Sequence, residues 1–380
     1  MNRHFVKVGI KTQGAPILKR CQDHTLLKNM LIGDGFHWQT TIKVLLPGEI
    51  SILNPKSVES EETSKISDAD RHITLINILP LETYLECVVG SEMNPSAPME
   101  FLKAHAVISR SWVLGKITGN HHSESIGHKN TSDSLVGWDD TSGHKGFDVC
   151  SDDHCQRYQG LQSISPVTLQ AIRYTSDEVL LSPDGKVVDT RFSKCCGGKT
   201  EIFSTCWQPY EVSCLESFDD PWCDLSGLST MRRRLLLSSV LKEYDLSTEG
   251  YGFRWNTEIS KDHVAKNLQD RFHRNVGKVL RIEPLHRGPS SRIDLLRIHG
   301  SLSCLDIGKE LWIRRLLSPT HLYSSAFEVE DLGPSVRLTG KGWGHGVGLC
   351  QIGAANMASH GYSYRDILSF YYPGAKLHKL

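Results

Sequence analysis

Trp343 and His345 alternate with glycine in a stretch near the C-terminal end of the chain. It reads Gly340-Lys-Gly-Trp-Gly-His-Gly-Val-Gly348, with glycine at every second position. In an extended chain alternate side chains face opposite ways, which would leave one face of this stretch as bare backbone. An indole ring can stack on a sugar, and an imidazole can titrate or hydrogen-bond a hydroxyl. The pattern predicts either a site for an extended polymer or a tight packing seam in the core.

Two histidines and two cysteines that fall within twelve positions have the side chains that Zn²⁺ prefers. They are His144, Cys150, His154 and Cys155. Thiolate and imidazole ligands hold Zn²⁺ tetrahedrally at about 2.0–2.3 Å. The spacing is not that of a standard zinc finger, and the adjacent His154 and Cys155 would need a strained loop to bind one ion together. Cys195, Cys196 or Cys206 could supply a ligand instead, and a disulfide or unligated thiols are the alternatives to a metal.

The composition narrows the classes of function. The 380 residues suffice for one large or two ordinary domains, and 43 basic residues balance 43 acidic ones. A formal net charge of zero argues against nucleic acid or an anionic membrane as the main partner. We expect no transmembrane segment, because no run of about 18 apolar residues occurs. The N-terminus lacks the apolar region of a secretory signal, so we expect a protein that stays inside, lacks its leader or uses another export route.

Several helices and strands must position these residues. A stripe of apolar residues over 81–89 predicts a half-buried helix after Pro80, ended or interrupted at Gly90. A second helix over about 98–116 is apolar nearly all round, which is typical of a helix at the centre of a domain. Strands are expected over 5–55, 73–79, 169–174, 178–182 and 278–330, helical segments over 229–280, a long loop over 119–145, and two short C-terminal helices.

This mixture predicts an α+β fold, a β-rich scaffold around a buried central helix. The cleft would lie between the helix pair and the C-terminal Gly-rich segment. We expect four parts: an N-terminal β-rich segment over 1–72, a core with the central helix and the Cys/His cluster over 73–228, an α/β accessory lobe over 229–335, and the Gly-rich motif with its helix over 336–380, which completes the core.

Five ordered blocks of residues resemble the stage II sporulation protein D family, which includes the LytB-type amidase enhancers. The first is Leu79-Pro-Leu-Glu-Thr-Tyr-Leu-Glu-Cys-Val-Val-Gly-Ser-Glu-Met-Asn-Pro95, continuing through Glu100–Arg110. The others are Cys155-Gln-Arg-Tyr158, Cys196-Gly-Gly-Lys-Thr-Glu201, Ser325-Ala-Phe327 and the tail from Gly342 to Gly374. The chain departs from the family at three places: His105 replaces the usual Gln, Cys350 replaces the usual Ser, and Lys194-Cys195 replaces small polar residues.

The resemblance implies a lytic transglycosylase that cleaves peptidoglycan glycan strands stripped of their peptides, with Glu92 as the catalytic acid. Protonating a glycosidic oxygen requires a carboxylic acid with a raised pKa, which burial can provide. One carboxyl can then act twice, first as the acid and then as the base on the sugar's own 6-hydroxyl. Zinc near the Cys/His cluster is compatible with the family; it would be structural or would help to hold the sugar beside the cleft.

The resemblance also suggests residues that would bind the glycan. Trp343 and His345 would line the cleft with Glu92, the Glu92 carboxyl and the His345 ring lying within about 10 Å of each other. Lys103 and Arg110 project from the central helix, and they either contact the substrate or pair with carboxylates. Gln351 is a candidate sugar ligand or backbone clamp. The alternative is that these residues have only structural roles, and that they pack in the core or form ion pairs there.

Two further readings of the function are kept. One is a non-catalytic glycan-binding module that enhances a cell-wall amidase, which would need the glycine track and the cleft but not Glu92. The other is a cytoplasmic protein that has kept the scaffold for another polymer, an option that rests on the missing leader. A peptidoglycan substrate predicts a place in the cell envelope, in the periplasm or at the outer face of the inner membrane.

Overall fold

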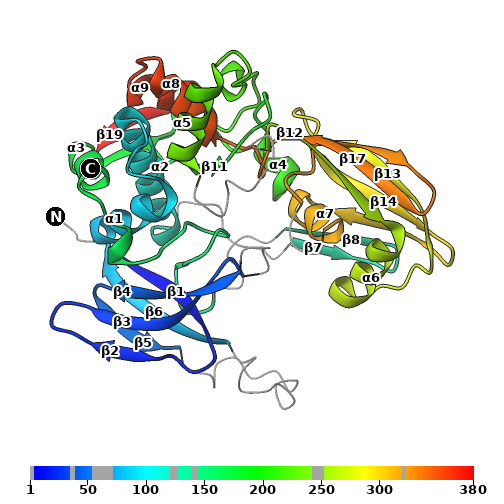
Figure 1. The fold of residues 1–380 in the computed structure, drawn as a ribbon, viewed down its shortest axis with the longest axis horizontal. Coiled ribbons are helices and arrows are strands. Elements are labelled where there is room, and N and C mark those ends of the chain that lie inside the picture. Colours follow the sequence, from blue (N-terminus) through cyan, green and yellow to red (C-terminus); the bar gives the residue numbers. More distant parts are fainter. Residues whose placement is uncertain are drawn as a thin grey trace.

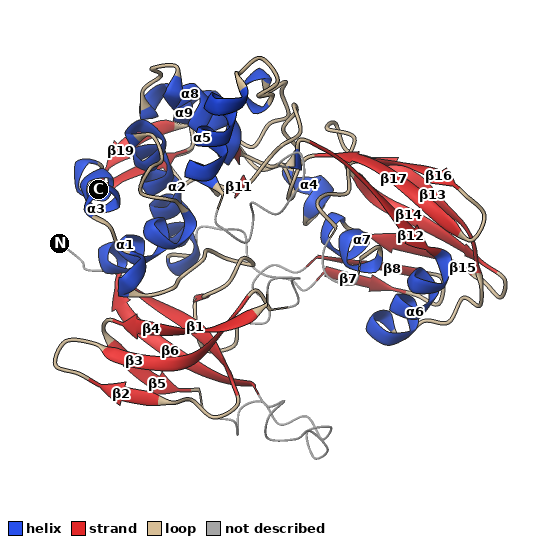
Figure 2. Ribbon diagram, viewed as in Figure 1, coloured by secondary structure: helices blue, strands red, loops and turns tan. Residues whose placement is uncertain are grey.

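The computed structural model of the protein describes residues 4–34, 39–53, 72–119, 127–138, 144–241, 252–318 and 322–380. It confirms the predicted mixture of helices and sheets. Figure 2 shows most helices gathered in one part of the molecule and the larger sheets in two others. Three hydrophobic cores correspond to an N-terminal sheet, a helical part and a lobe.

The N-terminal sheet is built from seven strands. Its order is β2-β3-β1-β6-β5, with β4 on β3 and β9 parallel to β1. The strands are β1 Phe5–Gln13, β2 Leu18–Arg20, β3 Thr25–Ile32, β4 Thr40–Leu46, β5 Glu49–Ile52, β6 His72–Pro80 and β9 Val149–Cys150. Strand β9 brings the Cys/His cluster to the edge of β1, and β6 leads directly into the helix that ends at Glu92.

The helical part surrounds α2, which is buried along most of its length, as the sequence predicts. Its helices are α1 Leu81–Glu92, α2 Met99–Ile117, α3 Pro166–Tyr174, α4 Phe203–Cys206, α5 Thr230–Val240, α8 Gln351–Ser359 and α9 Tyr364–Tyr371, with 3₁₀ turns η3 Leu161–Ser163 and η4 Pro221–Cys223. Two small strand pairs connect the C-terminal part of the chain to it: β10 Glu178–Leu181 with β19 Lys376–Lys379, and β11 Phe192–Ser193 with β18 Leu349–Cys350.

The lobe holds two further sheets, which Figure 1 places beside the helical part. One has the order β13-β14-β15-β8-β7 and the other β12-β17-β16. Their strands are β7 Gly127–Asn130, β8 Ser134–Trp138, β12 Arg254–Ser260, β13 Val279–Arg287, β14 Ile293–Gly300, β15 Cys304–Gly308, β16 Phe327–Asp331 and β17 Ser335–Lys341, and the helices are α6 Lys261–Phe272 and α7 Glu310–Leu316.

The strand pairing crosses the sequence boundaries that we expected at 72, 228 and 335. Strand β6, from the expected core, belongs to the N-terminal sheet. Strands β7 and β8 come from the expected core and join β15 of the lobe, with Ser134 opposite Asp306. Strand β17 spans the last boundary. The sheets recruit partners from distant segments because hydrogen-bonding partners in a sheet need not be neighbours in sequence.

Three expectations about local structure are corrected. Residues 166–174 form helix α3 and not a strand, because Ser165 caps the N–H of Thr168, Thr168 bonds back to Ser165, and Pro166 suits a first turn. The described part of 119–145 is not a continuous loop, since it contains β7 and β8. Helix α1 also continues through Gly90 to Glu92, where the backbone of Gly90 packs against that of Ser163.

Candidate functional site

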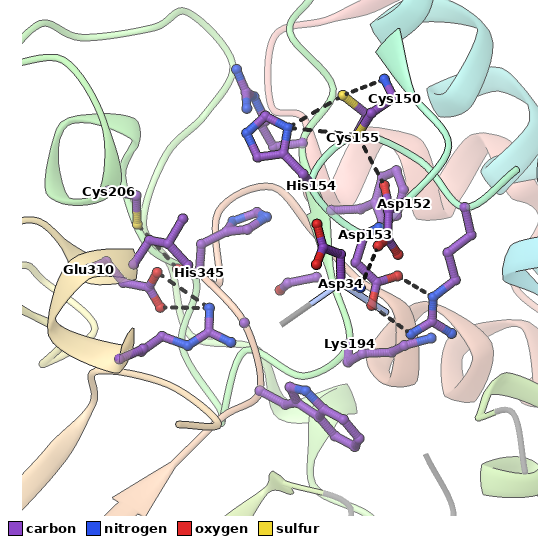
Figure 3. Close-up of a pocket in the computed structure, with 18 of the residues that line it drawn as sticks. Asp34, Cys150, Asp152, Asp153, His154, Cys155, Lys194, Cys206, Glu310 and His345 are labelled. Atoms are coloured by element: carbon purple, nitrogen blue, oxygen red, sulfur yellow. Dashed lines mark hydrogen bonds and ion pairs between the residues drawn. The ribbon is translucent and has the colours of Figure 1, made fainter. Parts of the chain in front are cut away.

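A pocket of about 800 Å³ lies where the N-terminal sheet, the helical part and the lobe meet. Its wall takes residues from β1, from the segment 144–157, from the segment 191–194, from α7 and from the Gly-rich segment. The helix pair α1 and α2 contributes Glu92 and Trp112. Figure 3 shows Cys150, His154, Cys155, Lys194 and His345 around this space. The pocket thus has more walls than a cleft between two elements.

Glu92 is the buried carboxyl of the pocket. It is the last residue of α1, is 5 % exposed, and its Oε1 accepts a hydrogen bond of 2.9 Å from the backbone N–H of Arg157. Burial raises the pKa of Glu92, and the charges of Arg157 and Lys194 offset only part of this effect. A carboxylate at the C-terminal end of a helix is also disfavoured by the helix dipole. Glu92 is therefore suited to hold a proton at the wall of the pocket.

Arg157 is held in place by Asp153. Its Nη2 donates to Oδ2 of Asp153 at 3.0 Å, and its Nε donates to the other oxygen of the same carboxylate. Both residues line the pocket, and Arg157 is 4 % exposed. The sequence reasoning missed this pair, although Arg157 lies inside the Cys155–Tyr158 block. The spacing of four between them is no signal here, because residues 151–157 form turns and irregular chain and not the helix in which such a spacing favours an ion pair.

His345 lines the same pocket as Glu92 and is neutral. Its Nδ1 accepts the N–H of Val347 at 3.0 Å, and its ring packs edge-on against Trp207 with ring centres 4.9 Å apart. Burial, followed by the charges of Arg191, Arg292 and Arg314, lowers the pKa of His345 to about 3. His345 can therefore accept or donate hydrogen bonds, but it is not a reservoir of protons near neutral pH.

Trp343 and Gln351 complete the part of the wall that the C-terminal segment provides. Trp343 is half-buried and pairs through its backbone with Cys195, in bonds of 2.7 and 3.1 Å. Gln351 begins α8, is 1 % exposed, and its Nε2 lies 3.2 Å from Nε2 of His105. Among the described residues no group hydrogen-bonds to Oε1 of Gln351.

Lys103 and Arg110 do not line the pocket. The Arg110 guanidinium binds Glu82 in a bidentate pair of 2.7 and 2.9 Å and also reaches the carbonyl of Glu178. The Nζ of Lys103 lies 2.6 Å from Oε1 of Glu100 and 3.7 Å from the ring centre of Tyr174. Of the two roles that the sequence left open, carboxylate pairing is the one that the geometry supports.

The Gly-rich segment is not an extended strand beyond β17. Gly342, Gly344, Gly346 and Gly348 all have positive φ, between 69° and 94°, a region that residues with a Cβ rarely adopt. A Cβ on Gly342 would also lie 3.0–3.1 Å from the carbonyl oxygens of Cys195 and Cys196. The glycines therefore form a packing seam, against backbone at Gly342 and Gly348 and against the Arg292 side chain at Gly346. The side chains of Trp343 and His345 between them line the pocket.

The Cys/His cluster that the sequence predicted is brought together. The ligand atoms of His144, Cys150, His154 and Cys155 all lie within 4.8 Å of one another. Sγ of Cys155 is 3.6 Å from Nδ1 of His154 and 3.8 Å from Nε2 of His144, close to the edges of a zinc tetrahedron with bonds of about 2.0–2.3 Å. The adjacent His154 and Cys155 reach one point without a positive φ at either residue.

The two thiols of the cluster share one proton. Contact with Cys155 holds the pKa of the Cys150 thiol well below its ordinary value, while burial and the neighbouring Cys150 hold that of Cys155 well above it. All four residues line the pocket that contains Glu92. The donor set therefore fits Zn²⁺, with two sulfur and two nitrogen ligands.

Comparison with known proteins confirms the resemblance stated from the sequence blocks. Residues 69–181 match the family model described as stage II sporulation protein, and residues 201–348 match a domain of unknown function. An uncharacterized protein of Brachyspira hyodysenteriae is 27 % identical over 310 residues, covering 80 % of this chain and 68 % of that protein.

Two relatives with named roles come from Bacillus subtilis. Stage II sporulation protein D is 24 % identical over 79 % of this chain and 74 % of its own length. The amidase enhancer is 24 % identical over 77 % of this chain but only 40 % of its own length. Among the described residues, no helix has both the length and the apolar character needed to cross a membrane.

Proposed function

We propose that this chain is a peptidoglycan lytic transglycosylase with Glu92 as its acid and base. The premise is that it belongs to the family of stage II sporulation protein D and the amidase enhancers, which has a cell-wall-related role. The observation that carries the proposal is the position of Glu92, a buried carboxyl with a raised pKa at the wall of a pocket that Trp343 and His345 also line. The substrate would be a glycan strand without peptides.

The reaction would use the same carboxyl twice. Protonated Glu92 gives its proton to the glycosidic oxygen as the bond to the sugar's anomeric carbon breaks and an oxocarbenium-like centre forms. The resulting carboxylate takes the proton of the 6-hydroxyl of that sugar, whose oxygen closes on the anomeric carbon. The products are a shortened strand and a 1,6-anhydro end, and no water is consumed. The N–H of Arg157 stabilises the carboxylate between the two steps.

The remaining residues of the wall would bind and orient the strand. The Trp343 ring would stack on a sugar face, the neutral His345 would hydrogen-bond a hydroxyl, and Gln351 at the same wall would contact the strand. His144, Cys150, His154 and Cys155 would hold Zn²⁺, which supplies a Lewis acid for sugar oxygens and a brace for the loop that carries Arg157. A peptidoglycan substrate would place the protein in the cell envelope.

The test is the substitution Glu92→Gln, assayed on glycan strands freed of peptides. We expect release of 1,6-anhydro ends, measured by mass spectrometry, to fall by about 10²–10⁴-fold, while sedimentation with the strands is retained. Glu86→Gln is the matched control, since Glu86 lies on the same helix but does not line the pocket. Equal release by Glu92→Gln and the wild type would contradict the assignment.

The second candidate is an enhancer of a cell-wall amidase, which the similarity to the amidase enhancer favours. It predicts that the wild type binds the strands, releases nothing, and raises the rate of a cell-wall amidase on intact peptidoglycan. In that case Glu92→Gln would stimulate the amidase as well as the wild type does. The two candidates thus differ in the product of the wild type alone.

A further inference from the structure

A second set of sulfur ligands lies outside the pocket, in the core of the helical part. Four cysteines converge from three segments: Cys195 and Cys196 after β11, Cys223 in η4, and Cys350 at the N-cap of α8. Each is at most 1 % exposed. Single buried cysteines are ordinary small apolar residues, but four that meet at one point from three separate segments are a different arrangement.

The sulfur separations match a metal site better than a disulfide. Sγ of Cys223 lies 3.3 Å from Sγ of Cys195 and 3.4 Å from Sγ of Cys350. A disulfide bond is about 2.05 Å long, whereas Zn–S bonds of about 2.3 Å place two sulfurs of a tetrahedron roughly 3.8 Å apart. Cys196 also contacts both Cys223 and Cys350 through its thiol, and Cys195 does the same. The thiols of Cys223 and Cys350 are therefore both in contact with the thiols of Cys195 and Cys196.

A buried carboxylate stands next to the thiols. Asp220 is 1 % exposed, and its Oδ2 lies 3.2 Å from Sγ of Cys196. It accepts hydrogen bonds from neutral donors, the Tyr371 hydroxyl at 2.9 Å and the N–H of Trp222 at 3.0 Å. Ligand atoms of Cys196, Asp220, Cys223 and Cys350 all lie within 4.8 Å of one another. A divalent cation would offset part of the negative charge that thiolates and this carboxylate would otherwise bury without a counterion.

We propose that Cys195, Cys196, Cys223 and Cys350 bind a second, structural Zn²⁺, with the Asp220 carboxylate beside it. Zn²⁺ displaces the four thiol protons to solvent, and no electron is transferred.

The bound ion would stabilise the wall of the pocket from the side of the helical core. Cys195 pairs through its backbone with Trp343, and Cys350 directly precedes Gln351. The Sγ of Cys350 also accepts the backbone N–H groups of Cys196 and Gly353 at 3.4 Å or less. A metal bound here would fix the loop 194–198, η4 and the start of α8 relative to one another. Its role is thus one of positioning, whatever reaction the pocket carries out.

The test measures zinc in the full chain by elemental analysis and by native mass spectrometry. We expect two zinc ions per wild-type chain, one in Cys223→Ser and Cys350→Ser, and one in the double variant Cys150→Ser with Cys155→Ser. X-ray absorption should give an average of three sulfur and one nitrogen ligands in the wild type, and four sulfurs in the last variant. Cys214→Ser is the matched control, a buried cysteine of the same core outside the cluster, and it should keep both ions.

Several results would overturn the proposal. Unchanged zinc in both Cys223→Ser and Cys350→Ser would do so, as would a wild-type mass lowered by two hydrogens together with two missing thiols, which indicates a disulfide. Zinc lost in Asp220→Asn but kept in Cys195→Ser would refute the ligand set. Cys350→Ser introduces the residue usual in the family, so it provides a variant that should fold even where Cys223→Ser does not. Because the readout is metal content, it is independent of glycan cleavage.

Discussion

The backbone N–H of Arg157 points at Oε1 of Glu92 across 2.9 Å, in a part of the pocket wall that is nearly closed to solvent. The bond favours the ionised carboxylate, but burial acts in the opposite direction and outweighs it. The carboxyl can thus hold a proton and can also be stabilised after losing it. A group that must act first as an acid and then as a base needs both properties.

Glu92 should reduce the stability of the protein at neutral pH. Its folded pKa is raised, so its contribution to stability is present below the unfolded pKa, about 4.3, and is lost as the pH rises through the folded pKa. Glu92→Gln removes this titration and can still accept the N–H of Arg157. We expect the variant to melt at a higher temperature than the wild type at pH 7, with a difference that shrinks toward pH 4. A variant less stable than the wild type at pH 7 would contradict the raised pKa.

His345 should leave no trace in the pH dependence of activity between pH 5 and 8. Its pKa is lowered to about 3, so it stays neutral over this range. His345→Asn should slow strand cleavage on the order of 10²-fold by misplacing the sugar, yet leave the midpoint of the alkaline decline unchanged. Rates measured from pH 4 to 9 test this. Loss of a transition near pH 6.5 in the variant would instead assign that proton to His345.

Gly346→Ala should destabilise the protein more than a substitution that strains the backbone alone. Gly346 has φ of +75°, and an added Cβ would lie 2.5 Å from the guanidinium carbon of the buried Arg292. Gly333→Ala is the matched control, since Gly333 has φ of +88° with nothing within 4 Å of the added Cβ. We expect a loss of roughly 1–2 kcal/mol for the control and a larger loss for Gly346→Ala, measured by urea unfolding. Equal losses of unfolding free energy in the two variants would show that the Arg292 side chain moves aside without cost.

Arg110→Met should affect folding and not glycan binding. The guanidinium is fully buried and bonds to Glu82 and to the carbonyl of Glu178. Its removal leaves the Glu82 carboxylate and the Glu178 carbonyl without this donor. Glu82 is partly exposed and can regain water, so we expect a cost of about 2–3 kcal/mol, less than for breaking a fully buried ion pair. Urea unfolding and sedimentation with glycan strands separate the two roles. Weaker binding at unchanged stability would restore the substrate contact that the sequence first suggested.

The sequence could predict the elements with strong local signals. The apolar stripe from Leu81 to Val89 forms α1, and the apolar helix that follows is buried as α2. The Cys/His cluster was predictable because its members lie within twelve positions and β9 holds them at one sheet edge. The placement of Trp343 and His345 at one pocket also agrees with the alternating pattern, although the glycines adopt positive φ and not a strand.

Features that depend on distant pairing could not be predicted in this way. Nothing local to Ser134–Trp138 indicates that β15 will be its partner. Cys223 and Cys350 meet across more than a hundred positions, so spacing carries no information about their contact. For α3 the information was local but misread, because the Ser165-Pro166 start signal outweighs the β-branched residues that follow. The roles of Lys103 and Arg110 depended on which carboxylates would lie nearby.

The lobe is not a detachable module. Its sheets take strands from 127–138 and from 254–341, and β17 leads without a break into the glycines that frame Trp343. Removal of residues 229–335 as a unit would separate β8 from its partner β15, and β12 from its partner β17. Recombination of this chain with its relatives would therefore have to exchange both of these stretches together, so that the lobe and the pocket must evolve as one unit.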